Sequence, residues 1–310
     1  MGLYFAPMEG ITSYTYRNAH SECFKGCDKY FAPFIVPTEN ERITLKTLKD
    51  LLPENNKTKV VPQVLSNDGK VFGEFTKKLL YLGYNEVNLN FGCPSGTVVK
   101  KNRGAGALKD LDALDKFLND AFSNCDIKIS VKTRTGFDSH EEFDKIMEVY
   151  NKYPISELIV HPRIREEYYK GSPNMTSFEK AYNSTKTDLC YNGDVWTKEI
   201  YDGLFTKYPN IKSVMLGRCA VKNPALFREI KGGEKLKTKE LIEFTKVLQE
   251  KYMELLKSEH YTFLRLKELW MLMVLNFEEE KKIVKGIKKS NKLSDLNATI
   301  AMLPEINQGE

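Results

Sequence analysis

A cysteine stands between a glycine and a proline in the stretch NLNFGCPSG, residues 88–96, directly after a short alternating apolar run. Gly92 and Pro94 end that run abruptly, so Cys93 is expected on a rigid turn at the end of a strand. A thiol held there can donate a proton, act as a nucleophile or simply pack as a small apolar group. No histidine is placed by the sequence to activate it, which argues against the nucleophile.

Polar residues follow other short apolar runs in the same way. In chain order they are Pro7, Met8 and Glu9, Gln63, Asn90, Lys132 and Arg134, His161 and Arg163, Asn192, Gly193 and Asp194, and Gly217 and Arg218. Any one of them is readily explained as a surface or structural group, but their repetition at strand after strand favours a common ligand. Amides suit the edge of a heterocycle, and Lys132 could stabilise negative charge on an electron-rich ring.

The elements that must position these residues are short strands that alternate with helical patterns. The strand-like runs are residues 3–7, 30–36, 59–65, 86–90, 127–133, 157–161, 188–193 and 213–217. Eight parallel strands separated by helices predict a (β/α)8 TIM barrel. A doubly wound open sheet is the main alternative, but its first loop normally carries G-x-G-x-x-G, which APMEGIT lacks.

In such a barrel, the carboxyl ends of the strands carry the chemistry, and the last two loops often bind phosphate. Here those loops contain glycines, which let backbone N–H groups approach a phosphate, and Arg218, which adds a charge-assisted bond. A phosphorylated cofactor with a redox-active ring fits this set, and the sequence therefore predicts FMN.

The pattern changes after about residue 230, where long helical runs replace the strands. We predict a catalytic barrel domain over residues 1–230 and a small all-α domain over 235–310, with a hinge at Gly232 and Gly233. The net charge of +5 lies in residues 231–292, which include KKIVKGIKK at 281–289. This pattern fits either a solvated helix face or a surface for a polyanion.

Composition sets further bounds on the 310-residue chain. Hydrophobic residues make up 41% and charged residues 29% of the chain, which is typical of globular proteins. No segment approaches the ~20 apolar residues of a membrane span, and the first residues lack the features of a leader, so we expect a cytoplasmic protein without a membrane partner. The six cysteines show no metal-binding spacing, and we expect no metal.

With these residues in view, the chain resembles the tRNA-dihydrouridine synthase family over roughly residues 3–230. The resemblance rests on the ordered segments APMEGITSYTYR, PQVL, NLNFGCPSGTVVKKNRGAGAL, VKTRTGF, HPRIREEYYKGSPN, YNGDV and GRCAVKNPALF. It implies an FMN-containing barrel with a helical tRNA-binding domain. It also implies reduction of the C5–C6 double bond of selected uridines in tRNA at the expense of NADPH.

The same resemblance implies roles for individual residues. Cys93 would be the catalytic acid. The flavin would be bound by Pro7, Met8, Glu9, Gln63, Lys132, His161, Asn192, Gly193, Asp194, Gly217 and Arg218. Asn90 and Arg134 would lie near the target base. The tRNA backbone would meet Lys100, Lys101, Arg103, Arg163, Arg165 and the lysines of 281–289. Where the family often has glycine after the histidine, this chain has Pro162, which removes a backbone donor.

Two other functions remain open from the sequence. One is an FMN barrel reductase of a free pyrimidine or small enone, similar to dihydroorotate dehydrogenases. The other is a tRNA-binding folding factor that has lost its redox role. The basic helical region argues against the first, and Cys93, Lys132 and Arg218 argue against the second. No protein partner is indicated.

Overall fold

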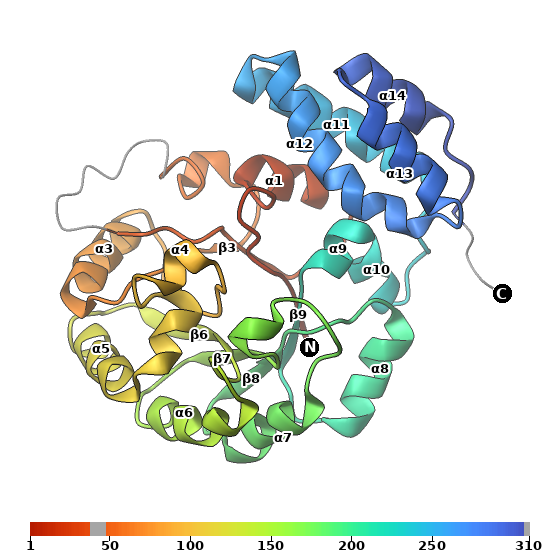
Figure 1. Cartoon of the computed structure of the whole chain (residues 1–310). Coiled ribbons are helices and arrows are strands. Elements are labelled where there is room, and N and C mark those ends of the chain that lie inside the picture. The colour runs from red at the N-terminus through yellow and green to blue at the C-terminus, as the bar shows by residue number, and fades with distance from the viewer. Residues whose placement is uncertain (38–47, 307–310) are drawn as a thin grey trace. The chain divides into compact units, whose positions relative to one another are not determined.

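The computed structural model describes residues 1–37 and 48–306 (Figure 1). Its residues group into two compact units, each assembled from three stretches of chain. The first unit comprises Met1–Pro7, Asp28–Asp194 and Gly203–Leu216. The second comprises Met8–Cys27, Val195–Asp202 and the chain from Gly217 onward. The last residues of the predicted α-helical domain, 307–310, lie outside the described part.

The first unit is built on nine parallel strands in the described part of the chain. They are β1 (Gly2–Phe5), β2 (Lys29–Phe31), β3 (Val60–Val61), β4 (Gln63–Val64), β5 (Glu86–Phe91), β6 (Lys128–Arg134), β7 (Glu157–His161), β8 (Asp188–Tyr191) and β9 (Ser213–Leu216). Their order is β3-β2-β1-β9-β8-β7-β6-β5-β4, so each strand lies beside a neighbour in sequence except where β1 meets β9. This is the cyclic order of a TIM barrel, and the predicted fold class is confirmed.

One interrupted segment joins the two ends of this sheet. β3 and β4 flank Pro62, which has no N–H to donate to a ladder. Val60 and Val61 pair with β2, whereas Gln63 and Val64 pair with β5. The Pro62 carbonyl still accepts a hydrogen bond from the Asn88 N–H at 2.9 Å. The segment therefore occupies one barrel position and changes neighbours at the proline.

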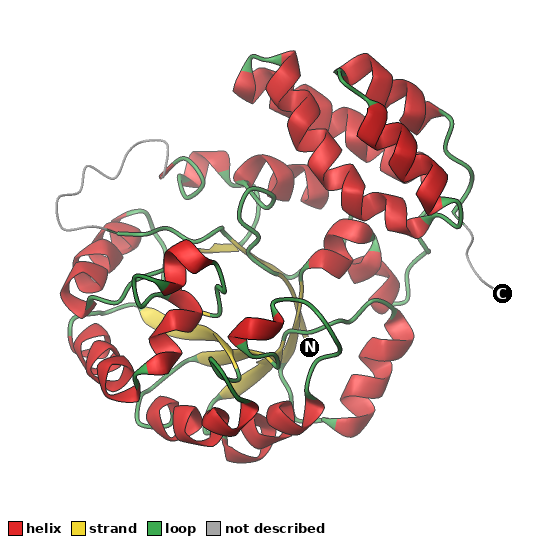
Figure 2. Ribbon diagram, in the orientation of Figure 1, coloured by secondary structure: helices red, strands yellow, loops and turns green. Residues whose placement is uncertain are grey.

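Helices surround these strands, as Figure 2 shows by colour. They are α3 (Gly69–Tyr81), α4 (Gly96–Val99), α5 (Leu111–Ser123), α6 (Phe143–Tyr150), α7 (Met175–Ser184) and α8 (Lys198–Lys207), of which α8 runs from the second unit into the first. Asp68, Asp110 and Asn174 cap α3, α5 and α7 through side-chain oxygens that accept backbone N–H groups. The enclosed core includes Ala6, Phe31, Val61, Ile159, Cys190 and Met215.

A polar cluster closes the amino-terminal end of the barrel. The Lys29 ammonium lies 3.1 Å from a Glu86 carboxylate oxygen and 3.9 Å from one of Glu157. The Ser213 hydroxyl donates to Glu157 at 2.6 Å. Burial raises the pKa of the Glu157 carboxyl, while Ser213 and Lys29 oppose that shift. These first residues of four strands fill the end of the barrel opposite the predicted site.

The second unit is helical. It contains α1 (Tyr14–Cys23), α9 (Arg218–Lys222), α10 (Leu226–Ile230), α11 (Thr238–Leu256), α12 (Glu259–Met273), the 3-10 turn η5 (Val274–Asn276), α13 (Glu280–Lys289) and α14 (Leu293–Ala301). The predicted helical C-terminal region is therefore present. Among the described residues, no helix combines the length and apolar character that crossing a lipid bilayer requires.

An aromatic cluster ties the N-terminal helix α1 to α10 and α11. The ring of Phe244 on α11 meets those of Tyr16 and Phe24 edge-on at 5.7 and 5.2 Å. His20 lies among these rings and against Phe227 at 5.6 Å, and it is hydrogen-bonded to the Pro224 carbonyl at 2.9 Å. Burial lowers the pKa of His20 to about 4. This grouping differs from the predicted division at 230–235, because residues 8–27 and 217–230 pack with the C-terminal helices.

Candidate active site

The Cys93 turn is fixed by the side chain of Asn90. The Asn90 Oδ1 atom accepts hydrogen bonds from the Gly92 N–H at 3.0 Å and from the Cys93 N–H at 2.9 Å. This arrangement turns the chain immediately after β5 and leaves Cys93 half-buried. The strand-end turn expected from the glycine and proline is present, and an asparagine three residues earlier holds it.

A second segment packs tightly against this turn. The Ala105 N–H donates to the Cys93 carbonyl at 3.0 Å. Gly104 has a φ of +56°, and a Cβ atom on it would lie 2.7 Å from that carbonyl oxygen. A Cβ atom on Gly106 would lie 2.7 Å from the Val99 carbonyl oxygen. Gly104 therefore allows close packing against Cys93, and Gly106 allows it against Val99.

A ladder of buried amides runs inward from the turn. Asn90 Nδ2 donates to Gln63 Oε1 at 2.8 Å, and Gln63 Nε2 donates to Asn88 Oδ1 at 2.7 Å. Asn88 Nδ2 in turn donates to the Ser130 hydroxyl at 3.0 Å. Gln63 is only 1% exposed. The amides of Gln63 and Asn90 thus bind each other, and their contacts with a cofactor or base stay predictions.

Lys132 brings an uncompensated cation to this end of the barrel. It lies beside Asn90 in the register of β5 and β6 and is partly exposed. Its ammonium makes no hydrogen bond or ion pair with any other residue in the described part of the chain. Burial and the nearby Arg134 guanidinium lower the pKa of Lys132 to about 8. An electron-rich or anionic ligand would satisfy this charge.

Arg134, by contrast, is hydrogen-bonded to the protein backbone. Its side chain is buried and donates to the carbonyl oxygens of Gly92, Ile164 and Tyr168 at 2.8, 2.9 and 2.9 Å. Burial lowers its pKa to about 10. The guanidinium thereby ties the Cys93 turn to the loop after β7. Its predicted place near the target base stays a prediction, and its observed contacts support the Cys93 turn and the β7 loop.

Arg163 is also buried, and it organises the neighbouring loop. Its guanidinium donates to Asp194 Oδ2 at 2.6 Å and to the carbonyl oxygen of Gly171, and it lies 3.0 Å from His161 Nε2. Because a guanidinium only donates, Nε2 must accept, and the His161 proton is assigned to Nδ1. The prediction that Arg163 meets tRNA phosphates gains no support from this burial.

The other predicted RNA-contacting residues of the first unit differ in exposure. Lys100 and Lys101 are exposed on the loop after α4. Arg103 is half-buried and donates to Asn67 Oδ1 at 2.9 Å. The Arg165 guanidinium pairs with Glu166 and lies near the ring of Phe137, with 5.6 Å between its Cζ atom and the ring centroid. Lys100 and Lys101 are therefore the most accessible cations of this set.

The remaining predicted flavin residues are divided between the two units. In the first unit, Asn192, which immediately precedes Gly193, donates from Nδ2 to the Met215 carbonyl at 2.8 Å. In the second, the Met8 N–H donates to the Thr12 hydroxyl at 2.8 Å. Glu9 is exposed in that unit, and Gly217 and Arg218 begin α9. The roles of Pro7, Met8, Glu9, Gly217 and Arg218 stay predictions.

Two aromatic residues were not singled out from the sequence. The Tyr169 ring lies 6.0 Å from that of His161 and 5.7 Å from the Arg134 guanidinium carbon, so it covers the β7 loop. Trp196 lies in the second unit, with Arg218 over its ring. The chain has two tryptophans, and Trp196 lies two residues after Asp194. This position beside a predicted flavin-binding segment is a sequence signal that could have identified Trp196 as a candidate binding residue.

Together, the first unit presents a thiol, an unpaired ammonium and an imidazole at the carboxyl ends of β5, β6 and β7. This donor set fits a flavin, whose ring has acceptor atoms and gains negative charge on reduction. Lys132 contributes most to this fit, because its ammonium has no partner among the described residues and could pair with negative charge on the flavin ring.

Two solved structures illustrate the similarity of fold. An old yellow enzyme from Trypanosoma cruzi matches with a TM-score of 0.52 and 9% identity, covering 74% of this chain and 88% of that one. A 2-naphthoyl-CoA reductase complex matches with a TM-score of 0.57 and 9% identity, covering 74% of this chain and 50% of that one. At these identities the likeness establishes the class of fold, a parallel β/α barrel.

The sequence comparisons are more specific. The dihydrouridine synthase model matches residues 4–301. The tRNA-dihydrouridine synthase B of Pseudomonas putida is 23% identical over 262 residues, which cover 80% of this chain and 74% of that protein. The tRNA-dihydrouridine(16) synthase of Neisseria meningitidis serogroup B is 27% identical over 287 residues, covering 87% and 84%. The chain belongs to the dihydrouridine synthase family and is a flavin-dependent oxidoreductase.

Proposed function

We propose that this protein is a tRNA-dihydrouridine synthase that uses FMN and NADPH, with Cys93 as the acid that protonates C5 of the target uracil. The observation that carries the proposal is the placement of Cys93. Asn90 and Arg134 both hold its turn at the end of β5, and Lys132 stands on the neighbouring strand. Family membership supplies the reaction class.

Lys132, Gln63 and His161 are the residues of the first unit that would hold the flavin ring. The reduced flavin supplies the hydride that uracil C6 requires. The Lys132 ammonium would stabilise negative charge on the bound ring, and His161 offers an Nδ1–H whose direction Arg163 sets from the other nitrogen. We expect Asn192–Asp194, Gly217 and Arg218 to bind the ribityl chain and phosphate.

Cys93 would provide the proton that completes the reduction. Proton donation needs the neutral thiol, positioned within hydrogen-bond reach of C5. The fixed turn is well suited to this task because the backbone N–H and C=O of Cys93 are both used, at 2.9 and 3.0 Å. The backbone therefore does not have to reorganise when the base arrives.

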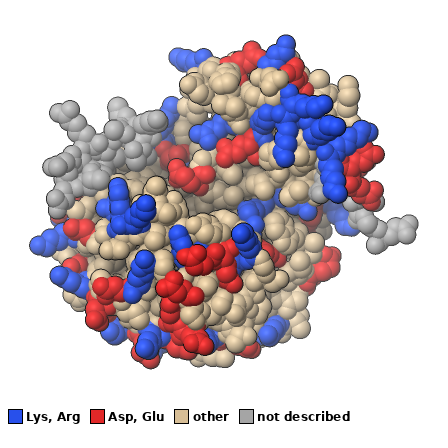
Figure 3. Space-filling model, in the orientation of Figure 1, with Lys and Arg blue, Asp and Glu red and all other residues tan. Residues whose placement is uncertain are grey.

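Binding of tRNA would come from cations on both units. The target base must leave its stack, which costs a few kcal/mol, and phosphate contacts would offset that cost. Lys100 and Lys101 are exposed on the first unit. On the second, Figure 3 shows basic side chains gathered over the region where Figure 1 labels α13. We assign tRNA binding chiefly to the C-terminal helical region, with α13 as its main contact.

The replacement Cys93→Ala tests the acid role. We expect the variant to bind FMN and to oxidise NADPH normally, while dihydrouridine formation in unmodified tRNA falls by at least 100-fold. Cys125→Ala is the matched control, since Cys125 is another half-buried thiol and precedes β6. Dihydrouridine is measured by mass spectrometry of digested tRNA.

Undiminished product from Cys93→Ala would refute the acid role. Turnover of free uracil or a small enone by the wild-type protein, without any product in tRNA, would instead identify a small-molecule reductase.

A further inference from the structure

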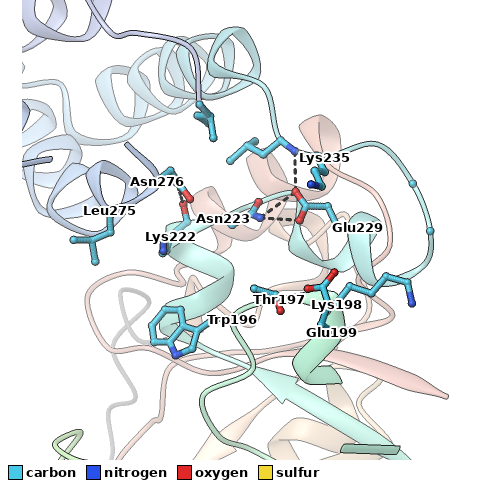
Figure 4. Close-up of a pocket in the computed structure, with 14 residues that line it drawn as sticks. Trp196, Thr197, Lys198, Glu199, Lys222, Asn223, Glu229, Lys235, Leu275 and Asn276 are labelled. Carbon is cyan, nitrogen blue, oxygen red and sulfur yellow. Dashed lines mark hydrogen bonds between the residues drawn. The ribbon is translucent and has the colours of Figure 1, made fainter. Parts of the chain in front are cut away.

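The second unit contains a pocket of about 690 Å³ that the predicted chemistry does not use (Figure 4). Its wall is formed by residues 196–199 at the start of α8, by the end of α9, by α10 and the loop after it, by η5 and by Ile306. In Figure 4, Trp196, Lys222 and Leu275 lie on one side of the pocket, and Glu199 and Glu229 lie on the other. A volume of this size is typical of sites for small organic groups.

The tryptophan side of the pocket combines an aromatic surface with positive charge. Trp196 is partly exposed, and the Lys222 ammonium lies 5.7 Å from its ring centroid. Lys222 makes no hydrogen bond or ion pair through its ammonium with any residue that the structure describes. Leu275 adds an apolar side chain that is 40% exposed. A flat aromatic group with an attached anion would match these three side chains.

The acidic side of the pocket keeps its negative charge, and hydrogen bonds from neutral groups of the protein hold the Glu229 carboxylate in place. Both carboxylate oxygens of Glu229 accept hydrogen bonds from Asn223 Nδ2 at 3.0 Å, and one also accepts the Leu236 N–H at 2.7 Å. The ammonium of Lys198, which also lines the pocket, is paired with Asp202 at 2.6 Å. An anionic group would therefore avoid the glutamates and lie on the tryptophan side of the pocket, against Lys222.

We propose that this pocket binds one nucleotide of the substrate RNA other than the uridine that is reduced. Its base stacks on Trp196, and its phosphate lies against Lys222. Every base has a π face, so stacking on an indole accepts any base, while a lysine recognises the phosphate as a point charge. The proposal rests on the proposed function for the identity of the RNA, but the stacking itself can be tested without turnover.

Fluorescence provides the direct test, because the chain has two tryptophans and Trp270 is 0% exposed. We expect short oligouridylate and oligoadenylate to quench the emission of the holoenzyme excited at long wavelength, through stacking on Trp196. The variant Trp196→Phe should lose this response and keep the emission of Trp270. An unquenched wild-type protein at saturating oligonucleotide would overturn the proposal.

Affinity for unmodified tRNA provides the second test. We expect Trp196→Ala to weaken binding about 10-fold and Trp196→Phe to retain most of it. Lys222→Gln should weaken binding and reduce the slope of log affinity against log salt by about one. Tyr261→Ala, an exposed aromatic on α12, and Lys246→Gln, an exposed lysine on α11, are matched controls that should bind normally. Unchanged affinity in both pocket variants would refute the assignment.

Two measurements separate this pocket from the rest of the proposal. Flavin reduction by NADPH is followed without RNA in Trp196→Ala. A several-fold slower reduction would show that the pocket holds the nucleotide of the reductant and would overturn the RNA assignment. If the wild-type protein forms no dihydrouridine, the proposed function fails, and oligonucleotide quenching alone still decides whether the pocket binds nucleotides.

Discussion

Lys132 and Arg134, which are separated by one residue on β6, differ in the partners of their charged groups. Arg134 has three carbonyl partners and supports the neighbouring loops, whereas Lys132 has an ammonium without a partner among the described residues. The sequence alone treated both as candidate ligand contacts. Only the positions of Gly92, Ile164 and Tyr168 show that the Arg134 guanidinium is structural, whereas the Lys132 ammonium is open to a ligand.

The low pKa of Lys132 predicts a pH-dependent flavin affinity. Because burial and Arg134 lower this pKa to about 8, the ammonium is present below that pH and is lost as the pH rises through it. We expect the affinity of the flavin-free protein for FMN to fall several-fold between pH 7 and 9.5, as measured by quenching of FMN fluorescence.

The variant Lys132→Arg should flatten this profile, since a guanidinium keeps its charge, and Lys132→Met should bind FMN weakly at every pH. A wild-type affinity that does not change over the same range would contradict the role given to this ammonium.

At the scale of elements, Cys93 depends on the 3-10 turn η2 (Gly104–Lys109) that packs beneath it. Gly104→Ala would place a methyl group 2.7 Å from the Cys93 carbonyl oxygen, at a φ of +56° that L-residues rarely adopt. We expect this change to lower the free energy of unfolding by about 1–3 kcal/mol and to reduce dihydrouridine formation.

Gly96→Ala is the matched control for that variant. Gly96 begins α4 in the same loop, and a Cβ atom on it would meet nothing within 4 Å. Alanine there should leave the stability unchanged or slightly higher, because it favours the helix. Equal effects of the two replacements, in urea denaturation and in activity, would show that close packing at Gly104 is not what holds the Cys93 turn.

The strands were predictable because short apolar runs and their flanking glycines and prolines are local signals. The run at 157–161 coincides with β7, and the run at 86–90 with most of β5. The run at 59–65 is divided into two short strands by Pro62. The burial of Arg163 was not predictable, since it depends on Asp194, which is 31 residues away.

At the scale of the whole molecule, the sequence indicated a C-terminal helical region but not the earlier segments that pack with it. Gly232 and Gly233, where a hinge was expected, are exposed residues within the second unit. The predicted division near residue 230 followed the change from strands to helices in the sequence. The aromatic cluster of α1 and α11 joins residues distant in sequence, and helical periodicity cannot show that pairing. As a result, the predicted boundary left α1 in the barrel domain.

The net charge of the chain suggests a test of RNA binding by α13. Lys281, Lys285, Lys288 and Lys289 are exposed and form no ion pair with other described side chains, while Ile283 and Ile287 are buried. Changing these four lysines to glutamine should lower tRNA affinity at least 10-fold at moderate salt. It should also reduce the salt slope by about three to four.

The control for the α13 variant changes the same net charge elsewhere in the second unit. It replaces four exposed lysines on and beside α11, namely Lys237, Lys239, Lys246 and Lys257. If both fourfold variants lose affinity equally, binding follows overall charge, and α13 has no special part in it.

The packing of α1 also bears on how the chain is made. His20 and its hydrogen-bond partner Pro224 are 204 residues apart, and Phe244 comes later still. During synthesis, α1 therefore emerges early from the ribosome, and its aromatic side chains stay exposed to solvent until most of the chain, including α11, has been made. A message that stops before α11 would release a product with a bare aromatic helix, the kind of surface that chaperones and proteases recognise.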